Sequence, residues 1–181
     1  MKELSLNILD IVQNSVKAGA TRIEICLEET DERFSFWVRD NGCGMSEELL
    51  SRVKDPFATT RTTRNVGLGI PLLTLAAEQT GGGVSIESST GEDHGTLIRA
   101  DFNKRHIDFT PLGDIVSTVT TVIQGNPDTD VIFSHSAGEG RVELSTPELR
   151  EVLDGVSLSE PEVLAWIEEN LRGQYDQMRM F

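Results

Sequence analysis

Apolar residues recur with the period of an α-helix over residues 3–18. Their side chains fall on one side and predict a buried stripe, made of Leu4, Ile8, Ile11, Val12 and Ser15. Asn7, Asp10 and Asn14 are three and four residues apart, so they share a neighbouring polar face of the same helix. Gly19, in the segment AGAT, predicts the end of this helix.

Two runs with the alternation of β-strands follow at residues 22–29 and 34–40, and the segment TDER between them predicts a hairpin. A second pair lies at 84–90 and 95–102, joined by GEDH. Between the pairs, IPLLTLAAEQT predicts a helix that GGG ends. Each strand has one apolar and one polar face, so we expect a sheet covered by helices on one side.

The pattern changes after residue 103, where we place a domain boundary. Residues 1–103 are predicted to form a two-layer α+β sandwich, and residues 104–181 a smaller α+β extension. Within the extension, Thr110 followed by Pro111 predicts a helix start. VIFSHS and RVELS predict a hairpin around AGEG, with His135 as a strand residue, and two further helices follow.

The last predicted helix is amphipathic, and its apolar stripe consists of Val163, Leu164, Ile167 and Leu171. Cys26 and Trp37 alternate onto the polar face of the sheet, which no predicted helix covers. We expect the last helix to pack on this open face around Trp37 or to mediate self-association.

The net charge of −14 is concentrated in the C-terminal part, where residues 106–181 hold 4 Lys/Arg and 14 Asp/Glu. This charge disfavours nucleic acid as a partner. It fits either an acidic solvated surface or a basic protein partner. No apolar run approaches the roughly 20 residues that span a bilayer. The first residues, MKELSLNILD, carry acids where a signal peptide has bases, so we expect a cytoplasmic protein.

Cysteine and histidine give no sign of a metal or disulfide framework. Cys26 and Cys43 form no CxxC pair, and two free thiols are expected. The histidines are scattered and have no HExxH-like neighbours: His94, His106 and His135. Metal catalysis by protein ligands alone is therefore not expected.

Four segments carry candidate chemistry, in the order ELSLNILDIVQNSVKAGAT, DNGCGM, PFATTRTTRNVGLGI and GTLIRADF. Each alone is a weak signal, since DNG or GLG usually marks a turn. In this order, and on these predicted elements, they resemble the Bergerat-fold ATPases, the group of gyrase, Hsp90, histidine kinases and MutL (GHKL), over residues 3–103. QNSVKAGATRIEI is most similar to MutL-type proteins, and the glycine-rich loop to histidine kinases. No GxxxxGK[ST] P-loop is present.

The segment DNGCGM indicates either an ordinary tight turn or a planar ligand lying against the backbone. The resemblance implies the second: Asp40 accepts a hydrogen bond from the adenine amino group, and Gly42 and Gly44 let the backbone approach the base. Thr96 completes the adenine contact, often through water. Met45 is assigned to the same cofactor-binding set.

The phosphate end of the implied site needs a cation and backbone N–H groups. The resemblance implies that the amide oxygen of Asn14 binds Mg²⁺, and that glycines before the next helix face the triphosphate. Arg61 or Arg64 reaches the γ-phosphate, or both belong to a solvated basic loop. Phe57 anchors a short lid over residues 55–66. The remaining expected cofactor-binding residues are Lys17, Gly67, Leu68 and Gly69.

Asp10 departs from the family pattern, in which ATPases place a glutamate four residues before the asparagine. The resemblance implies that Asp10 acts as a slow general base, or that it contacts the magnesium ion only through another ligand. Asn7, on the same face, is expected to be a helix-surface amide or one that contacts the site only through another residue.

The resemblance leaves three functions open. The lid favours a protein kinase acting in trans, similar to the anti-sigma-factor serine kinases, since the chain begins inside the first motif and no phosphoacceptor domain is expected. A MutL-like slow ATPase that switches a homodimer or a partner complex is the alternative. A nucleotide-binding module without turnover is the third. ATP and Mg²⁺ are the expected cofactors, and a partner protein the expected substrate or regulator.

Overall fold

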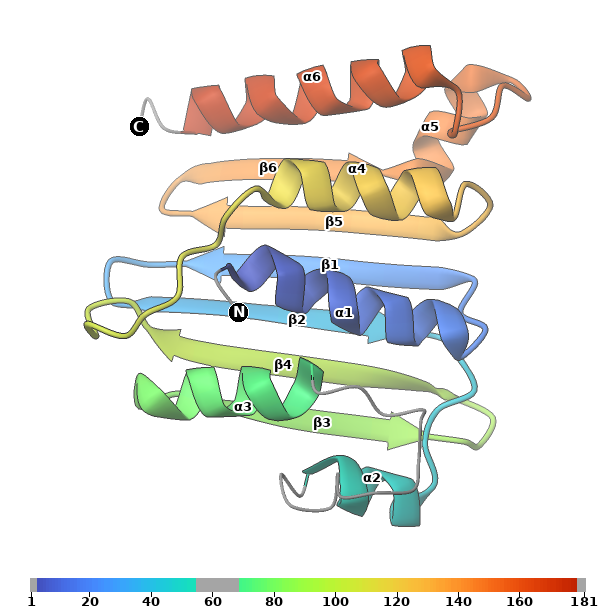
Figure 1. Ribbon diagram of the computed structural model, residues 1–181. Coiled ribbons are helices and arrows are strands. Elements are labelled where there is room, and N and C mark those ends of the chain that lie inside the picture. The colour runs from blue at the N-terminus through green and yellow to red at the C-terminus, as the bar shows by residue number, and fades with distance from the viewer. Residues whose placement is uncertain (1–2, 55–68, 179–181) are drawn as a thin grey trace.

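Figure 1 shows the computed structural model, which describes residues 3–54 and 69–178. In this part of the chain six helices accompany one sheet. In chain order the elements are α1 (Leu4–Lys17), β1 (Arg22–Glu29), β2 (Arg33–Asp40), α2 (Glu47–Lys54), α3 (Gly69–Gln79), β3 (Gly83–Ser89), β4 (Gly95–Asn103), α4 (Ile115–Gly125), β5 (Asp130–Ala137), β6 (Gly140–Ser145), α5 (Thr146–Leu153) and α6 (Pro161–Met178).

The sheet is mixed and has the strand order β3-β4-β2-β1-β5-β6. The two predicted hairpins, β1–β2 and β3–β4, are confirmed, and β2 pairs antiparallel with β4 to join them. The predicted hairpin β5–β6 also forms. β5 runs parallel to β1, so the C-terminal part extends the sheet that the first hairpins build.

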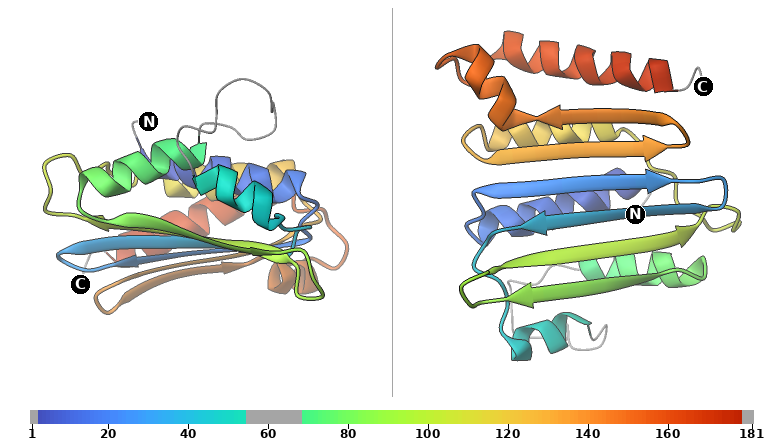
Figure 2. Two further views of the ribbon diagram at one scale, coloured as in Figure 1. Left: turned by 90° about the horizontal axis from the view of Figure 1, so that it is seen from below. Right: turned by 180° about the vertical axis from the view of Figure 1, so that it is seen from behind.

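Helices α1, α3 and α4 cover one face of the sheet, as the edge-on view in Figure 2 shows. The inward positions of the strands are buried beneath them, and the largest of these side chains are Ile23, Ile25, Leu27, Phe34, Phe36, Phe102 and Phe133. The opposite face carries no helix among the residues that the structure describes (Figure 2). The predicted α+β fold of two layers is thereby confirmed.

The buried stripe of α1 is confirmed, and Ser15 belongs to it. The expectation of a surface amide at Asn7 is wrong, because its side chain is only 3% exposed. α1 contacts both α3 and α4, so it is covered on two sides as well as by the sheet. A helix between two neighbours buries more of its circumference than its own polar pattern indicates.

Helix α4 begins later than predicted. Its N-cap is Asp114, whose side chain accepts a hydrogen bond from the Ser117 backbone N–H at 3.0 Å. That bond also lowers the pKa of Asp114. The backbone carbonyls of Pro111 and Leu112 instead accept from the first N–H groups of α1, at 2.9 Å from Leu4 N and 2.8 Å from Ser5 N. The segment at Pro111 therefore lies outside the helix, and its carbonyl groups cap the N-terminus of α1.

The apolar stripe of α6 is buried as predicted, at Leu164, Ile167 and Leu171. Its expected position on the open face around Trp37 is wrong, because α6 packs against β6 and α4. There its Gln174 side chain hydrogen-bonds the backbone N–H and C=O of Glu143 on the edge strand. This pairing covers part of an edge that would otherwise expose unpaired backbone groups. Trp37 is half-buried beneath the Arg39 guanidinium, 5.6 Å from the ring centroid.

Helix α2 was not predicted. The Ser46 hydroxyl accepts from Leu49 N at 3.3 Å at its start, and Leu50 and Val53 pack against the core. The segment is short and has few apolar residues, so its periodicity is weak. Across the described ranges, 3–54 and 69–178, no helix combines the length and apolar character needed to cross a bilayer.

Candidate functional site

A row of three polar side chains crosses three strands beneath the helices. Ser88 on β3 pairs with Thr96 on β4, and Thr96 pairs with Asp40 at the end of β2. Cross-strand partners point to the same face of a sheet, and Asp40 is 9% exposed on the helix-covered face. The fold therefore brings together Asp40 and Thr96, two of the predicted base-contacting residues.

The carboxylate of Asp40 is held from two sides. The Ser15 hydroxyl of α1 donates to Oδ2 at 2.6 Å, and the backbone N–H of Gly42 donates to Oδ1 at 2.9 Å. Both bonds fix the orientation of the carboxylate. Each carboxylate oxygen has a second lone pair, so Asp40 can accept a further donor from a ligand.

The turn after Asp40 is anchored to the end of α1 and the start of β1. The Asn41 side-chain oxygen accepts from the backbone N–H groups of Thr21 and Arg22, each at 2.9 Å. The Cys43 N–H donates to the Ala18 carbonyl at 2.9 Å. Asn41 is therefore a structural residue of the motif, and its amide nitrogen also donates to the Thr21 hydroxyl at 2.9 Å.

The β3–β4 hairpin holds the other side of this turn. His94 Nδ1 lies 2.7 Å from the Gly42 carbonyl oxygen, which only accepts, so Nδ1 carries the hydrogen. The Met45 N–H donates to the Ser88 hydroxyl at 2.8 Å. The Met45 side chain is half-buried and packs against the core. The β3–β4 hairpin thus holds the turn at two points, Gly42 and Met45.

Gly44 has a positive φ of 72°, and a Cβ there would lie 1.9 Å from the Ser89 carbonyl oxygen. A Cβ on Gly42 would lie 2.8 Å from the Cβ of Ala18. The chain's own packing therefore requires glycine at both positions. The implied role of these glycines toward a planar ligand is compatible with this packing and stays a prediction.

Asp10 and Asn14 lie one turn apart on α1, and both side chains are half-buried. The N-terminus of α3 lies beside Asp10, because a Cβ on Gly69 would lie 3.2 Å from Asp10 Oδ2. The first N–H groups of α3 have no partner within the helix, so this end suits an anion. Lys17 is exposed in the last turn of α1.

Five of the predicted cofactor-binding residues lie outside the described residues: Phe57, Arg61, Arg64, Gly67 and Leu68. The predicted lid over residues 55–66 lies outside them as well. The assignments at these positions rest on the sequence alone.

Sequence reasoning missed three residues that shape the site. Ser15 was placed on the buried stripe of α1, and a polar residue there is a sign of a buried partner. Ser88 occupies an inward position of its strand, which is the same kind of sign. His94 lies in a turn and gives no signal in the sequence.

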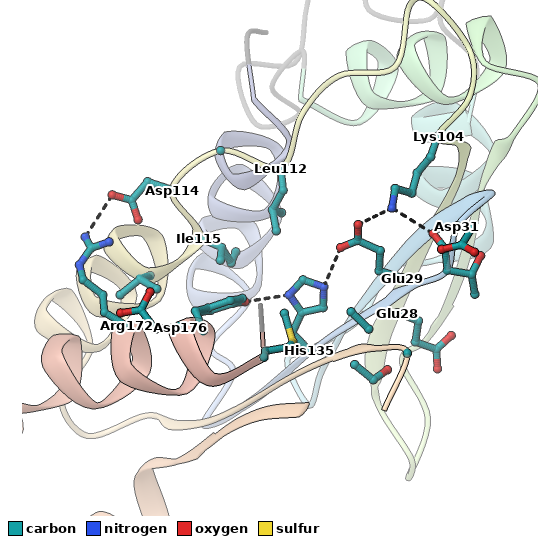
Figure 3. Close-up of a pocket in the computed structure, with 18 residues that line it drawn as sticks. Glu28, Glu29, Asp31, Lys104, Leu112, Asp114, Ile115, His135, Arg172 and Asp176 are labelled. Atoms are coloured by element: carbon teal, nitrogen blue, oxygen red, sulfur yellow. Dashed lines mark hydrogen bonds and ion pairs between the residues drawn. The ribbon is translucent and has the colours of Figure 1, made fainter. Parts of the chain in front are cut away.

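A hollow of about 1290 Å³ lies away from these residues, at the other end of the strands (Figure 3). Its walls come from the β1–β2 turn, the start of α4, the β5–β6 turn and the end of α6. Asp40 pairs with Ile23, and Glu29 in the hollow lies six residues further along β1. The two places are therefore about 20 Å apart, and no predicted nucleotide-binding residue lines the hollow.

A polar network crosses this hollow and joins the two halves of the chain (Figure 3). His135 on β5 is confirmed as a strand residue and is 1% exposed. Its Nδ1 lies 2.8 Å from the Tyr175 hydroxyl of α6, and its Nε2 lies 3.4 Å from Glu29 Oε2. The latter is an electrostatic contact without good hydrogen-bond alignment. Lys104 binds the other Glu29 oxygen and donates to the Thr30 carbonyl at 3.0 Å.

Glu29→Gln should make stability less sensitive to acid. Contact with His135, and then with Lys104, lowers the pKa of Glu29 from 4.5 to about 2, against the opposing effect of burial. A carboxylate whose pKa is lower in the folded state than in the unfolded state stabilises the fold at pH values above the unfolded pKa. This stabilisation is lost as the pH falls through the folded-state pKa. The wild type should therefore have a higher unfolding free energy than Glu29→Gln at pH 4.5, and this difference should shrink as the pH falls to about 2.

Urea unfolding at a series of pH values measures this difference. Glu28→Gln changes the adjacent exposed carboxylate in the same way and serves as the matched control, for which we expect a much smaller trend. A constant difference between wild type and Glu29→Gln down to pH 2 would contradict the assignment.

Comparisons with known proteins agree with this geometry. A family described as histidine kinase-, DNA gyrase B- and HSP90-like ATPases matches residues 2–106. The tetrathionate sensor histidine kinase TtrS of Salmonella typhimurium is 33% identical over 97 residues, 52% of this chain and 16% of TtrS. Sporulation kinase A of Bacillus subtilis is 27% identical over 105 residues, 58% of this chain and 17% of that kinase. The chain thus spans about a sixth of the length of these relatives.

A solved structure extends the likeness beyond the family match. The N-terminal domain of a DNA repair protein aligns with a TM-score of 0.53 and 17% identity, over 80% of this chain and 53% of that chain. At this identity the likeness shows the fold alone. The family match covers more than half of the chain, and the chain therefore belongs to the histidine kinase-, DNA gyrase B- and HSP90-like ATPases.

Proposed function

We propose that this chain binds Mg·ATP and acts as a protein kinase in trans, transferring the γ-phosphoryl group to a partner protein. The buried, oriented carboxylate of Asp40 carries the proposal of ATP binding. Family membership and the kinase relatives support it. The choice of transfer over hydrolysis rests on the resemblance of the glycine-rich loop to that of histidine kinases.

Asp40 would accept a hydrogen bond from the amino group of adenine. Its two fixed hydrogen bonds leave lone pairs free, and guanine presents a carbonyl at the equivalent position, which cannot donate. A buried acceptor discriminates strongly against a ligand that leaves it unpaired. Thr96, the partner of Asp40 across the strands, would complete this contact.

Asn14, Lys17 and the N-terminus of α3 would face the triphosphate. No group of three or more His, Cys, Asp or Glu residues able to hold a metal ion occurs within 3–54 and 69–178. Mg²⁺ would therefore depend on phosphate oxygens in addition to the Asn14 amide oxygen. When bound, the ion supplies neutralisation of the charge that develops on the transferred group.

Asp10 would act as the base, since it lies beside the N-terminus of α3. Asp10→Asn should lower turnover about a hundredfold, as is typical of a lost general base. The dissociation constant for ADP should change little, because the base contacts no part of ADP. Asp128→Asn, an exposed acid between α4 and β5, is the matched control and should leave turnover unchanged.

Incubation with γ-labelled ATP, with and without lysate of the source cell, tests the reaction. Label on a partner protein supports transfer. Release of free phosphate at an equal rate with and without lysate would contradict the kinase and support the alternative. Full turnover in Asp10→Asn would remove Asp10 from the mechanism.

The alternative is a slow ATPase that switches a dimer or a partner complex. Asp10 supports it in part, since ATPases that use water place a glutamate at this position, a carboxylate one methylene longer than the aspartate present here. Binding without turnover is the third outcome that the same assay distinguishes. Residues 104–181 are proposed to form an extension that a protein partner or a second copy contacts, in a cytoplasmic protein that binds neither nucleic acid nor membranes.

A further inference from the structure

We infer that Ser88 determines the selectivity of the base site, by making the Thr96 hydroxyl a hydrogen-bond acceptor toward the ligand. The inference rests on the proposed binding of an adenine nucleotide. It adds Ser88 to the base site and states the direction of the hydrogen bond between Ser88 and Thr96. It follows from the hydrogen bonds around one hydroxyl group on β3.

Three groups surround the Ser88 hydroxyl oxygen. The backbone N–H of Met45 donates to it at 2.8 Å. The Gly95 carbonyl oxygen lies 3.0 Å away and accepts from it. The Thr96 hydroxyl oxygen lies 2.8 Å away, and either hydroxyl can donate in that pair.

The number of hydrogens decides the direction of the Ser88–Thr96 bond. A hydroxyl has one hydrogen and two lone pairs, and a carbonyl oxygen only accepts. Ser88 therefore gives its hydrogen to Gly95 and accepts from Met45 with one lone pair. Its remaining lone pair accepts the hydrogen of Thr96. The opposite direction would leave Gly95 and Ser88 with two facing oxygens 3.0 Å apart and no hydrogen between them.

With its hydrogen committed to Ser88, Thr96 offers only lone pairs to a ligand. Asp40, its cross-strand partner, offers only lone pairs as well. Two adjacent acceptors match a base edge that carries an amino group, either directly or through one water molecule. A carbonyl oxygen at the same position of the base is disfavoured, because it would face two acceptors with no hydrogen between them. The row Ser88, Thr96, Asp40 therefore selects adenine over hypoxanthine through the direction of one hydrogen bond.

Titration calorimetry with ADP and IDP tests this inference, because IDP has a 6-oxo group and an N1–H where ADP has a 6-amino group and an unprotonated N1. In Ser88→Ala the Thr96 hydroxyl is free to turn and donate to the 6-oxo group. The ratio of ADP to IDP affinity should fall about fivefold, the effect of one net hydrogen bond. Ser88→Thr keeps a hydroxyl at the same place and should retain the wild-type ratio.

The ratio separates this role from a structural one. If Ser88 only supported the fold, Ser88→Ala would weaken both nucleotides equally, and the unchanged ratio would overturn the inference. In a Thr96→Val background the Ser88→Ala change should no longer affect the ratio. If Ser88→Ala does not fold, Thr96→Val alone decides, since loss of the acceptor should weaken ADP more than IDP. A wild type that binds neither nucleotide would overturn the proposed function, and this inference with it.

Discussion

Asp40→Asn should lower the affinity for Mg·ATP about a hundredfold, the value of a lost charge-assisted hydrogen bond plus a misplaced donor. The asparagine amide presents either its oxygen or its NH₂ to each neighbour. Ser15 and Gly42 both donate to the native carboxylate, so one of these donors or the ligand loses its acceptor. The same change removes the negative charge from a site that is 9% exposed.

A thermal or denaturant shift with Mg·ATP measures this loss. At a nucleotide concentration of 100 times the wild-type dissociation constant, binding stabilises the wild type by about 2.7 kcal/mol. A hundredfold weaker variant should retain about 0.4 kcal/mol of that shift. Unfolding without nucleotide reports any change in the stability of the fold itself.

Asp101→Asn is the matched control for this variant. Asp101 lies on β4 and its side chain is half-exposed beside Arg99, so its substitution removes the same charge from a surface position. We expect the full nucleotide shift in Asp101→Asn. A full shift in Asp40→Asn would contradict the adenine contact and with it the proposed function.

Gly44→Ala should destabilise the fold by several kcal/mol and abolish nucleotide binding. Its φ of 72° costs a residue with a Cβ roughly 1–2 kcal/mol. The Cβ would also lie 1.9 Å from the Ser89 carbonyl oxygen, and this backbone atom has no flexible side chain to move aside. The turn must therefore leave β3, which breaks the bond from Met45 to Ser88.

Gly19→Ala separates the two causes. Gly19 has a φ of 75°, and a Cβ there meets no atom within 4 Å. This variant should lose only the roughly 1–2 kcal/mol of the backbone conformation and keep its nucleotide affinity. Equal unfolding free energies of the two variants would contradict the close contact between the turn and β3.

The site and the hollow with Glu29 lie at opposite ends of the same strands. The β1–β2 hairpin carries Asp40 at one end and Glu29 at the other, and β1 also pairs with β5 of the C-terminal part. The network of Glu29, His135 and Tyr175 therefore ties the C-terminal part to the hairpin that holds the base-contacting carboxylate.

The local pattern of apolar and polar residues was sufficient to predict the helices and strands that bury one face. The strands of both early hairpins and the stripe of α1 follow from alternation and helical period, because burial of one face imposes these periods on the sequence. The DNGCGM segment alone left a tight turn and a ligand-contacting loop open, and the resemblance of the four segments to the Bergerat-fold ATPases implied the role of Asp40 and its glycines. Thr96 was assigned through the same resemblance, from the segment GTLIRADF.

Contacts between segments that are distant in the sequence could not be predicted from the local pattern of apolar and polar residues. The start of α4 depends on α1, whose first N–H groups bind the carbonyls of Pro111 and Leu112. The burial of Asn7 depends on the two helices beside α1. The position of α6 depends on the edge of β6, to which Gln174 binds.

The sequence by itself determined the periods, the turn glycines and the chemical groups at Asp10, Asn14 and Asp40, because these depend on neighbours within a few residues. The tertiary structure decided the partners: Ser15 and Asp40 are 25 residues apart, and His94 and Gly42 are 52 apart. A hydrogen bond requires its two groups within about 3 Å, a condition that only the folded arrangement of several elements can meet.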